Sequence, residues 1–301
     1  MIVLWMPGCE RLAGMACDLG ATAGRVEVHR FPDGEQRVRI GPVLRGEDVV
    51  LAGSLDWPDH TLLPLLFAAS TARDLGASSV GLVAPYLPYL RQDRSFQPGE
   101  GVSARYFAAL LSRAADWVVT VDPHLHRIRS LGDVFTVPAE AVHSAPLMGE
   151  WIRTQVRMPL ILGPDAESMQ WVASIARLAQ APYAVLAKSR AGDRNVVVTL
   201  PDLDRYAGRQ PVLVDDIISS GATMAAAIRA LRTAGWPAPV CLAVHALFAG
   251  GADEALRDAG AEDVITCNTV AHSSNALDVR GLLAGAVSRR LETRPAGRAM
   301  S

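Results

Sequence analysis

The sequence predicts an α/β fold in which parallel β-sheets are covered by helices. Short apolar runs typical of buried strands alternate with longer segments of helical periodicity along most of the 301 residues. This alternation favours parallel sheets flanked on both faces, because each crossover helix returns the chain to the same end of the sheet. Half of the residues are hydrophobic, and the length suits one large domain or two of ordinary size.

Each expected element follows from an apolar run and the turn residues beside it. The expected strands lie at 2–5, 25–29, 37–40, 49–52, 80–84, 117–121, 160–162, 183–187, 196–200, 212–214, 240–245 and 264–268. The expected helices lie at 10–19, 61–75, from Ser103 onward as its N-cap, and at 168–179, 224–234, 252–259 and 277–291. Residues 196–200 are expected to pair back across the preceding loop as a hairpin.

The pattern loosens at residues 138–158, which indicates a domain boundary. We therefore expect an N-terminal domain at 1–146, a C-terminal domain at 147–292 and a disordered tail at 293–301.

Charge and composition argue against several classes of protein. The net charge is −2 with acidic and basic residues interspersed, which does not favour a nucleic-acid-binding surface or a polybasic membrane patch. No apolar run approaches the roughly 18 residues of a membrane span. The four cysteines show no CxxC pairing, so we interpret them as reduced and mostly buried thiols. These features predict a cytoplasmic protein.

The segment 212–224 joins an apolar strand to a helix through an acidic pair and a loop of small residues. Backbone N–H groups at the start of a helix suit a phosphate, and adjacent carboxylates can accept hydrogen bonds from vicinal hydroxyls. This combination predicts a ribose 5-phosphate site. Its residues are Asp215, Asp216, Ser219, Ser220, Gly221, Ala222 and Thr223. The alternative is an ordinary strand–loop–helix turn with solvated carboxylates.

Other polar loops also follow expected strands, at the edge where ligands bind in such folds. Arg91 and Arg94 could clamp a polyphosphate, or they could belong to a solvated turn with an internal Arg–Asp pair. His124 could bind a phosphate-bound metal, whereas we interpret His126 as a surface or packing residue. Zinc is not favoured, because no cysteine or third histidine lies at a suitable spacing. The sequence has no GxGxxG or GxxxxGK[ST] motif.

Two further features leave their alternatives open. The residues Pro32-Asp33-Gly34 are a turn signal, equally consistent with a plain hairpin turn and with a functional loop. Lys188 is the only lysine among 29 basic residues. A compact ammonium can serve where a planar guanidinium cannot, although chance also explains a single lysine.

Taken together, these motifs resemble the ribose-phosphate pyrophosphokinase family, in a pattern closest to its archaeal-type branch. The resemblance runs from about residue 31 to about 268. It rests on FPDGE at 31–35, PYLPYLRQDR at 85–94, VDPH at 121–124, GPD at 163–165, KSR at 188–190 and VDDIISSGAT at 214–223. The last motif alone would fit any type I phosphoribosyltransferase, so the combination carries the resemblance.

The resemblance implies two phosphoribosyltransferase-type, Rossmann-like domains. It implies transfer of the diphosphoryl group of ATP to O1 of ribose 5-phosphate, with Mg²⁺ as cofactor, giving phosphoribosyl pyrophosphate and AMP. It also implies a homo-oligomer, at least a dimer, in which the FPDGE loop completes a neighbour's site. The implied ATP-binding residues are Phe31, Asp33, Gly34, Glu35, Arg91, Gln92 and Arg94. The implied metal ligands are His124 and Asp165, the catalytic residues Lys188 and Arg190, and the ribose 5-phosphate residues Arg190, Asp215, Asp216 and 219–223.

Some positions depart from the family pattern. Ala166-Glu167-Ser168 follows Asp165 where small residues are usual, and places an acidic side chain where a phosphate should approach. Ala222 stands where glycine is common, and Pro123 where an aliphatic residue is usual. The first departure keeps a catalytically weak regulatory paralogue as an alternative. A type I phosphoribosyltransferase is the other, but that reaction needs no ATP site such as the arginine and FPDGE loops provide.

Overall fold

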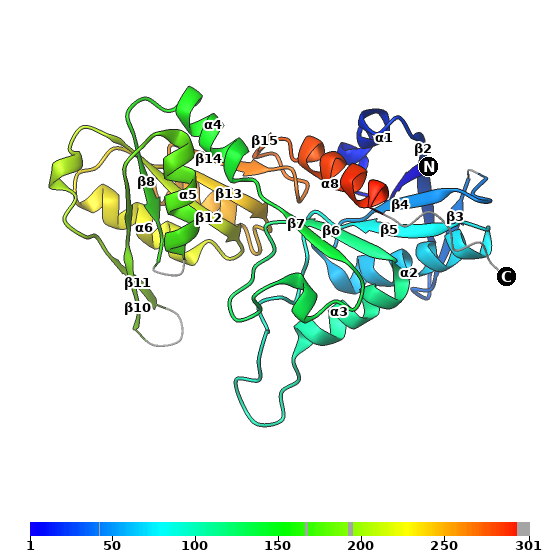
Figure 1. Cartoon of the computed structure of the whole chain (residues 1–301). Helices are drawn as coiled ribbons and strands as arrows, with labels where there is room; N and C mark the ends of the chain where they lie inside the picture. Colours follow the sequence, from blue (N-terminus) through cyan, green and yellow to red (C-terminus); the bar gives the residue numbers. More distant parts are fainter. Residues whose placement is uncertain (42, 166–167, 192–194, 294–301) are drawn as a thin grey trace. The chain divides into compact units, whose positions relative to one another are not determined.

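The computed structural model describes the chain except for residues 42, 166–167, 192–194 and 294–301. The expected tail therefore lies almost wholly outside the described residues. The contacts divide the protein into two units, one formed by Met1–Val142 with the segment that begins at Arg280, and one formed by His143–Val279 (Figure 1). Helix α8 (Arg280–Glu292) thus packs with the first unit, whereas the sequence assigned it to the second.

Helix α8 buries Leu283, Ala284, Ala286 and Val287 in the first unit, and two ion pairs add to this contact. Arg280 Nε lies 2.8 Å from Asp18 Oδ2, at the start of the helix. Arg289 Nη2 lies 2.7 Å from Glu140 Oε1, near its end. Neither partner is close in sequence, so the local pattern of α8 could not indicate where it packs.

The first unit is built on a seven-stranded sheet in the order β3-β2-β1-β4-β5-β6-β7. Its strands are β1 (Ile2–Trp5), β2 (Thr22–Arg30), β3 (Gln36–Ile40), β4 (Asp48–Ala52), β5 (Ser79–Val83), β6 (Trp117–Val121) and β7 (Ala139–Val142). All neighbours are parallel except β2 and β3, which form an antiparallel hairpin at one edge. Every residue of β5 and β6 is buried, as expected for parallel strands covered on both faces.

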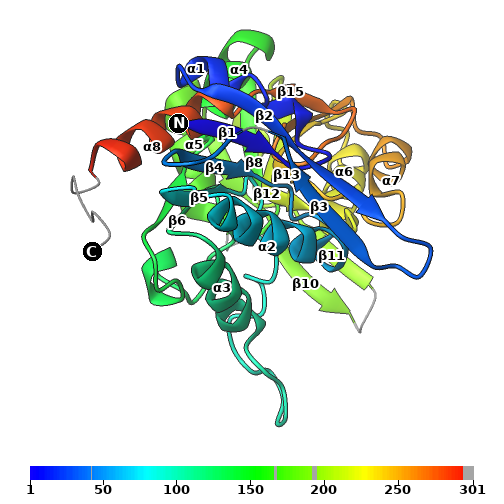
Figure 2. The ribbon, with the colours of Figure 1, turned by 90° about the vertical axis from the view of Figure 1, so that its right-hand side faces the viewer.

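Helices cover both faces of this sheet. Helices α2 (Pro58–Asp74) and α3 (Ser103–Ala114) pack their apolar sides against one face, where Leu65 and Phe107 join the core formed with Leu51 and Leu82. Figure 2 shows these two helices beside β4, β5 and β6. Helix α8 and the short α1 (Met15–Asp18) lie over the opposite face.

The second unit is built on a six-stranded sheet whose neighbouring strands are all parallel, in the order β15-β14-β13-β12-β8-β9. Its strands are β8 (Pro159–Gly163), β9 (Tyr183–Val185), β12 (Gln210–Ile218), β13 (Val240–Ala246), β14 (Asp263–Cys267) and β15 (Asn275–Leu277). Its helices are α4 (Ala145–Gln155), α5 (Met169–Ala179), α6 (Ala222–Thr233) and α7 (Ala252–Asp258). A separate antiparallel hairpin, β10 (Ala187–Ala191) with β11 (Asn195–Thr199), confirms the expected pairing.

Several local expectations need correction. The helix expected at 10–19 is a 3₁₀ turn at Glu10–Leu12 followed by α1, with Gly14, a poor helix former, between them. Ser103 is the first residue of α3 and Val102 is the N-cap, because the Ser103 hydroxyl bonds to Gln92 instead of capping the helix. Helix α2 begins at Pro58, in keeping with the preference for proline in a first turn.

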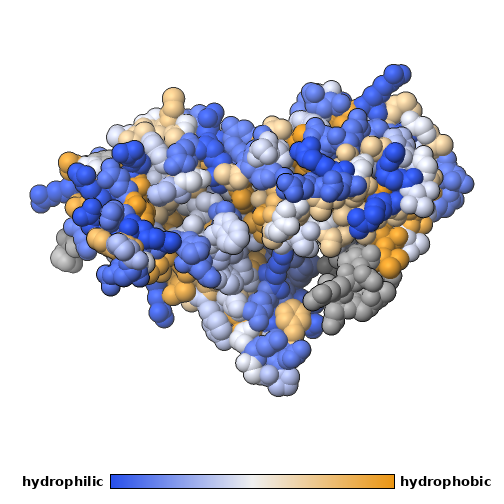
Figure 3. All heavy atoms as spheres, turned by 180° about the vertical axis from the view of Figure 1, so that it is seen from behind, coloured by the Kyte–Doolittle hydropathy of each residue, from blue (hydrophilic) through white to orange (hydrophobic). Residues whose placement is uncertain are grey.

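No helix among the described residues has the length and apolar character needed to cross a membrane. Cys9, Cys241 and Cys267 are buried, Cys17 is exposed, and all four are free thiols, as expected. Hydrophilic side chains are mixed with smaller apolar areas over the face shown in Figure 3.

Candidate active site

The loop between β12 and α6 forms an anion-binding helix start. Gly221 is the N-cap of α6 and has φ +68° and ψ −1°, a left-handed conformation that glycine adopts without steric cost. No side chain caps this helix start. Because the first N–H groups of a helix have no partner within it, those that follow Gly221 point toward the loop Ser219–Ser220 and can receive an anion there.

The acidic pair lies inside β12, which extends to Ile218 and not only to Val214 as expected. The adjacent strand β13 explains the extension, since Ile218 still pairs with Ala246. The Asp216 N–H donates to Asp215 Oδ1 over 3.0 Å. Asp215 and Asp216 are both half-buried residues near the carboxyl end of the sheet.

The pKa of the Asp215 carboxyl is raised well above its usual range. The largest cause is burial, followed by the negative charges of Asp216 and Asp165. Asp165 follows β8, the strand that pairs with β12. The second unit therefore brings together three of the expected site carboxylates and the α6 start at one edge of its sheet.

Of the three residues after Asp165 that depart from the family pattern, the structure describes Ser168. Residues 166 and 167 lie outside the described residues. Ser168 donates its hydroxyl to the Asp165 carbonyl oxygen over 2.6 Å, and its N–H to the same oxygen over 3.2 Å. A Cβ on Gly163 would collide with the Ser168 side chain and lie 2.9 Å from Val172 Cγ2, so the end of β8 requires glycine at 163.

The two expected catalytic residues lie on the β10–β11 hairpin. Lys188 pairs with Val198 and Arg190 with Val196 in the antiparallel register. The described structure fixes the backbone of both residues but not their side chains. The hairpin contacts α6 through β11, so its backbone belongs to the same unit as the anion-binding loop.

The FPDGE segment is a tight turn between β2 and β3. The Phe31 N–H donates to the Glu35 carbonyl over 2.8 Å, and the Gly34 N–H donates to the Phe31 carbonyl over 2.9 Å. Asp33 Oδ1 accepts the Glu35 N–H over 3.1 Å, and Gly34 has φ +92°. Structurally, the segment is thus a hairpin turn. Phe31 packs edge-to-face on His29, with 4.7 Å between ring centroids, and keeps 38% of its surface exposed.

The arginine loop leaves β5 and projects from the first unit before α3 begins (Figures 1 and 2). Gln92 is anchored to α3, because its side chain bonds to the Ser103 hydroxyl and its carbonyl accepts the Ala104 N–H over 3.2 Å. Arg91 and Arg94 are exposed. The Arg94 guanidinium lies over the Phe96 ring, 5.0 Å from its centroid. The alternative of an internal Arg–Asp pair is not seen among the described residues, where Asp93 pairs with Arg127 beyond β6.

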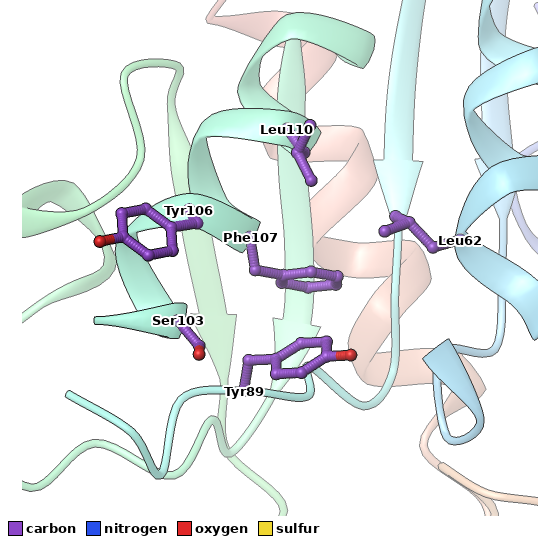
Figure 4. A pocket seen from close by; sticks show the side chains of 6 residues that line it. All are labelled: Leu62, Tyr89, Ser103, Tyr106, Phe107 and Leu110. Carbon is purple, nitrogen blue, oxygen red and sulfur yellow. The ribbon is translucent and has the colours of Figure 1, made fainter. Parts of the chain in front are cut away.

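A pocket lies behind the start of this loop. It is lined by Leu62, Tyr89, Ser103, Tyr106, Phe107 and Leu110. Figure 4 shows the rings of Tyr89 and Phe107 next to each other, and their centroids are 5.1 Å apart. Tyr89 has φ +65°, and its hydroxyl donates to Asp59 Oδ1 over 3.3 Å. This aromatic contact holds the strained turn that directs the chain from β5 to Arg91.

The expected metal residue His124 follows β6, the strand next to β5. It is half-buried and stacks edge-to-face on His126, with 4.2 Å between ring centroids. His126 is exposed, which agrees with its interpretation as a surface histidine. Asp122, at the end of β6, has φ +33° and its N–H donates to the Val142 carbonyl over 2.9 Å. Such strain in a non-glycine residue is common at functional sites.

The structure also identifies two residues that sequence reasoning left out of the site. Asp93 and Arg127 connect the arginine loop to the His124 loop through an ion pair of 3.1 Å. Asp93 was visible as the acidic residue inside RQDR, but nothing in the sequence indicated its partner.

Known families match both halves of the chain. The family of the N-terminal domain of ribose phosphate pyrophosphokinase matches residues 1–115, and the phosphoribosyl transferase domain family matches residues 130–280. The ribose-phosphate pyrophosphokinase of Methanopyrus kandleri is 37% identical over 275 residues, which cover 91% of this chain and 93% of that protein. The enzyme of the same name from Saccharolobus solfataricus is 34% identical, over 82% of this chain and 84% of that one.

A solved structure agrees with these sequence matches. The phosphoribosylpyrophosphate synthetase of Mycobacterium smegmatis superposes with a TM-score of 0.83 at 26% identity, over 97% of this chain and 99% of the other. Both the order of the domains and nearly the full length are therefore shared. This chain belongs to the ribose-phosphate pyrophosphokinase family.

Proposed function

We propose that the chain transfers the diphosphoryl group of ATP to O1 of ribose 5-phosphate and releases phosphoribosyl pyrophosphate and AMP. The observation that carries the proposal is the uncapped start of α6 beside the half-buried carboxylates of β12. A phosphate on the helix N–H groups and a diol on Asp215 and Asp216 describe a ribose 5-phosphate. ATP is the second substrate that family membership supports.

The reaction needs alignment and charge neutralisation more than covalent help from the protein. The O1 hydroxyl attacks the β-phosphorus of ATP, the bond from that phosphorus to the α-phosphate oxygen breaks, and AMP leaves. Asp215 and Asp216 orient the ribose through its hydroxyls. Lys188 and Arg190 supply positive charge for the oxygens of the transferring group. Arg91 and Arg94, exposed on the projecting loop, bind the polyphosphate.

The carboxylate oxygens at the carboxyl end of the second unit's sheet are of the kind that Mg²⁺ prefers. No group of three or more His, Cys, Asp or Glu side chains converges as a metal cage within the described part of the chain. Mg²⁺ needs no such cage, because it keeps waters and uses one or two carboxylates together with substrate phosphates. Asp165 is its proposed protein ligand at this edge, and His124, in the loop after β6 of the first unit, is proposed to bind a phosphate-bound Mg²⁺. When bound, Mg²⁺ would supply neutralising charge to the phosphates, and it would reduce the contribution of the Asp216 and Asp165 charges to the raised pKa of Asp215.

The topology of the first sheet supports a site completed by a second subunit. The FPDGE turn follows β2 and the arginine loop follows β5, with β1 and β4 between those strands. Three strand spacings amount to roughly 14 Å. The two ATP-binding segments of one chain are thus set apart along the sheet edge, and a neighbour's turn can supply the second one. We therefore propose a homo-oligomer in which a neighbouring chain's FPDGE turn completes the site. The cytoplasmic location stays a prediction, supported by the four free thiols.

Purified protein incubated with ATP, Mg²⁺ and ribose 5-phosphate tests the proposal. AMP and phosphoribosyl pyrophosphate should form in equal amounts, and omission of ribose 5-phosphate should abolish both. Absence of AMP above background over a range of phosphate and metal concentrations would reject the activity and favour a regulatory paralogue. Consumption of phosphoribosyl pyrophosphate with a nucleobase, without ATP binding, would favour a phosphoribosyltransferase.

A further inference from the structure

The carboxylate of Asp93 is fully withdrawn from solvent in a loop that is otherwise polar and exposed. Its side chain has 0% exposed surface, whereas that of Arg127 is 51% exposed. Asp93 Oδ2 accepts the Arg127 backbone N–H over 3.0 Å. Arg127 Nη1 donates to Asp93 Oδ1 over 3.1 Å and to Oδ2 over 3.4 Å. One residue thus binds the carboxylate through both its main chain and its side chain.

This contact joins the two loops that carry the expected nucleotide and metal residues of the first unit. Asp93 lies between Arg91 and Arg94 in the loop after β5, and Arg127 lies three residues beyond His124 in the loop after β6. Strands β5 and β6 are parallel neighbours, so both loops leave the same edge of the sheet.

The arginine loop is therefore fixed at two adjacent residues. Gln92 is held by Ser103 and Ala104 at the start of α3. Asp93 is held by Arg127. The flanking residues Arg91 and Arg94 are exposed, on a backbone segment that is connected through Asp93 to the His124 loop.

The lowered pKa of Asp93 indicates that its contact with Arg127 joins two charged groups. Burial opposes ionisation of Asp93, but the hydrogen bonds from the Arg127 N–H and guanidinium outweigh it, and the net pKa of Asp93 is lowered. Charge-assisted hydrogen bonds of this kind are stronger and more directional than neutral ones. Removing one partner leaves a buried carboxylate with fewer donors, which distorts the loop as well as weakening it.

We infer that the Asp93–Arg127 pair is a positioning device that aligns the ATP-binding arginines with the metal-binding histidine loop. Neither residue need touch the substrate. Arg127 holds Asp93, and Asp93 sets where Arg91 and Arg94 meet the polyphosphate, so that nucleotide and cation are received together. This inference rests on the proposed function of the first unit as the ATP-binding part of the enzyme.

The chain contains a matched control pair. Asp116 accepts the Val80 N–H over 2.7 Å and the two guanidinium nitrogens of Arg73 over 3.1 and 3.3 Å. This is the same combination of one backbone donor and one arginine, on a carboxylate whose side chain is 44% exposed where that of Asp93 is buried. Asp116 immediately precedes β6, at the edge of the sheet away from the two loops. Arg127→Met and Arg73→Met thus make the same chemical change in the same unit, with and without a connection to the arginine loop.

The test measures the dissociation constant of ATP with Mg²⁺ by calorimetry, the KM for ATP and kcat, and Tm for each variant. Arg127→Met should weaken ATP binding and raise its KM by roughly tenfold or more, the range seen when a residue that orients a ligand-binding group is lost. The KM for ribose 5-phosphate should stay near the wild-type value. Arg127→Lys should restore part of the ATP affinity, because it keeps the positive charge that Arg127→Met removes, whereas both variants keep the backbone donor. Arg73→Met should lower Tm without changing ATP affinity.

Failure of the positioning role and failure of the proposed activity give different results. Unchanged ATP affinity in Arg127→Met would overturn the inference while leaving the proposed activity intact. Equal losses of ATP affinity in Arg127→Met and Arg73→Met would also overturn it, since the effect would then follow stability alone. If the wild-type chain bound ATP without forming AMP, the comparison of ATP affinities would still decide on the pair. A wild-type chain that bound no ATP would reject both proposals.

Discussion

Gly221 at the start of α6 lies directly against Ala252 at the start of α7. A Cβ placed on Gly221 would be 3.2 Å from the Ala252 Cβ and 3.4 Å from its carbonyl oxygen. The same glycine has φ +68°. Two separate constraints, a left-handed backbone and a close neighbour, therefore act on the residue that shapes the proposed phosphate loop.

Gly221→Ala should lower stability and weaken ribose 5-phosphate binding. The left-handed conformation costs an L-residue roughly 1–2 kcal/mol, and contact with Ala252 adds to that cost. Relief of the strain would turn the first N–H groups of α6 away from the phosphate. The free energy of unfolding from urea titration, together with the KM for ribose 5-phosphate, checks both effects.

Gly235 provides the control at the other end of the same helix. It has φ +83°, and a Cβ placed on it would have no neighbouring atom within 4 Å. Gly235→Ala should show a comparable backbone cost with an unchanged KM. A KM that rose equally in both variants would show that loss of α6 stability, not loop geometry, controls ribose 5-phosphate binding.

Asp215→Asn should stabilise the protein near neutral pH while abolishing activity. Burial and the charges of Asp216 and Asp165 raise the pKa of the Asp215 carboxyl, so the folded chain holds this proton more tightly than the unfolded chain. The free energy of unfolding therefore falls as pH rises from the unfolded value of about 3.9 through the raised folded pKa, and stays low above it. Asparagine removes this loss, and its amide oxygen can still accept the Asp216 N–H.

The measurement is Tm of the wild type and Asp215→Asn from neutral pH down to about pH 4, where the advantage of the variant should shrink. Asp165→Asn should give a smaller gain of the same sign, because it removes one of the charges acting on Asp215. Asp258→Asn, an exposed carboxylate on α7, is the control. A gain for Asp215→Asn that grew toward acid pH would contradict the raised pKa.

The sequence predicted those strands and helices whose buried residues form one local pattern along the chain. Strands β1 and β6 have the expected boundaries, because each is an apolar run of four or five residues. Strand β7 was missed, since it is a half-buried edge strand that contains Glu140. Helix α4 was missed because the loose pattern at 138–158 was interpreted as a domain boundary, and α4 contains Gly149, a poor helix former. In the structure Gly149 allows α5 to pack closely against α4, because a Cβ at this position would lie only 2.5 Å from the Leu178 Cβ.

The site residues also differ in how far the sequence could identify them. The β12–α6 loop could be identified from the sequence, because its carboxylates and its glycine are neighbours in the chain. The Asp93–Arg127 pair could not, because its partners are 34 residues apart and meet only through the pairing of β5 with β6. The role of α8 likewise depends on distant partners. Contacts of this kind come from tertiary structure and leave no periodic signal.

Lys188→Ala should lower kcat by roughly 10²–10³-fold, the usual cost of removing one donor to charge that develops in a transition state. The dissociation constant of ATP should change little, because the arginine loop lies in the other unit. Lys188→Arg should recover only part of the turnover, since a planar guanidinium cannot replace a compact ammonium. Single-turnover rates and calorimetry separate the two effects. Equal losses of turnover and ATP affinity would contradict a role in the chemical step.

Complementation between inactive subunits should show whether the FPDGE turn serves a neighbour. Glu35→Ala and Arg91→Ala should each be nearly inactive alone. When the two are co-expressed with different tags and the mixed oligomer is purified, one site type receives an intact turn from one chain and an intact arginine loop from the other, so activity should return. The control mixes Arg91→Ala with Arg94→Ala. Both changes lie on the same loop, so every site in that oligomer carries one of them and activity should not recover. Recovery in neither mixture would mean that each chain uses its own turn, despite the two strands that separate β2 from β5.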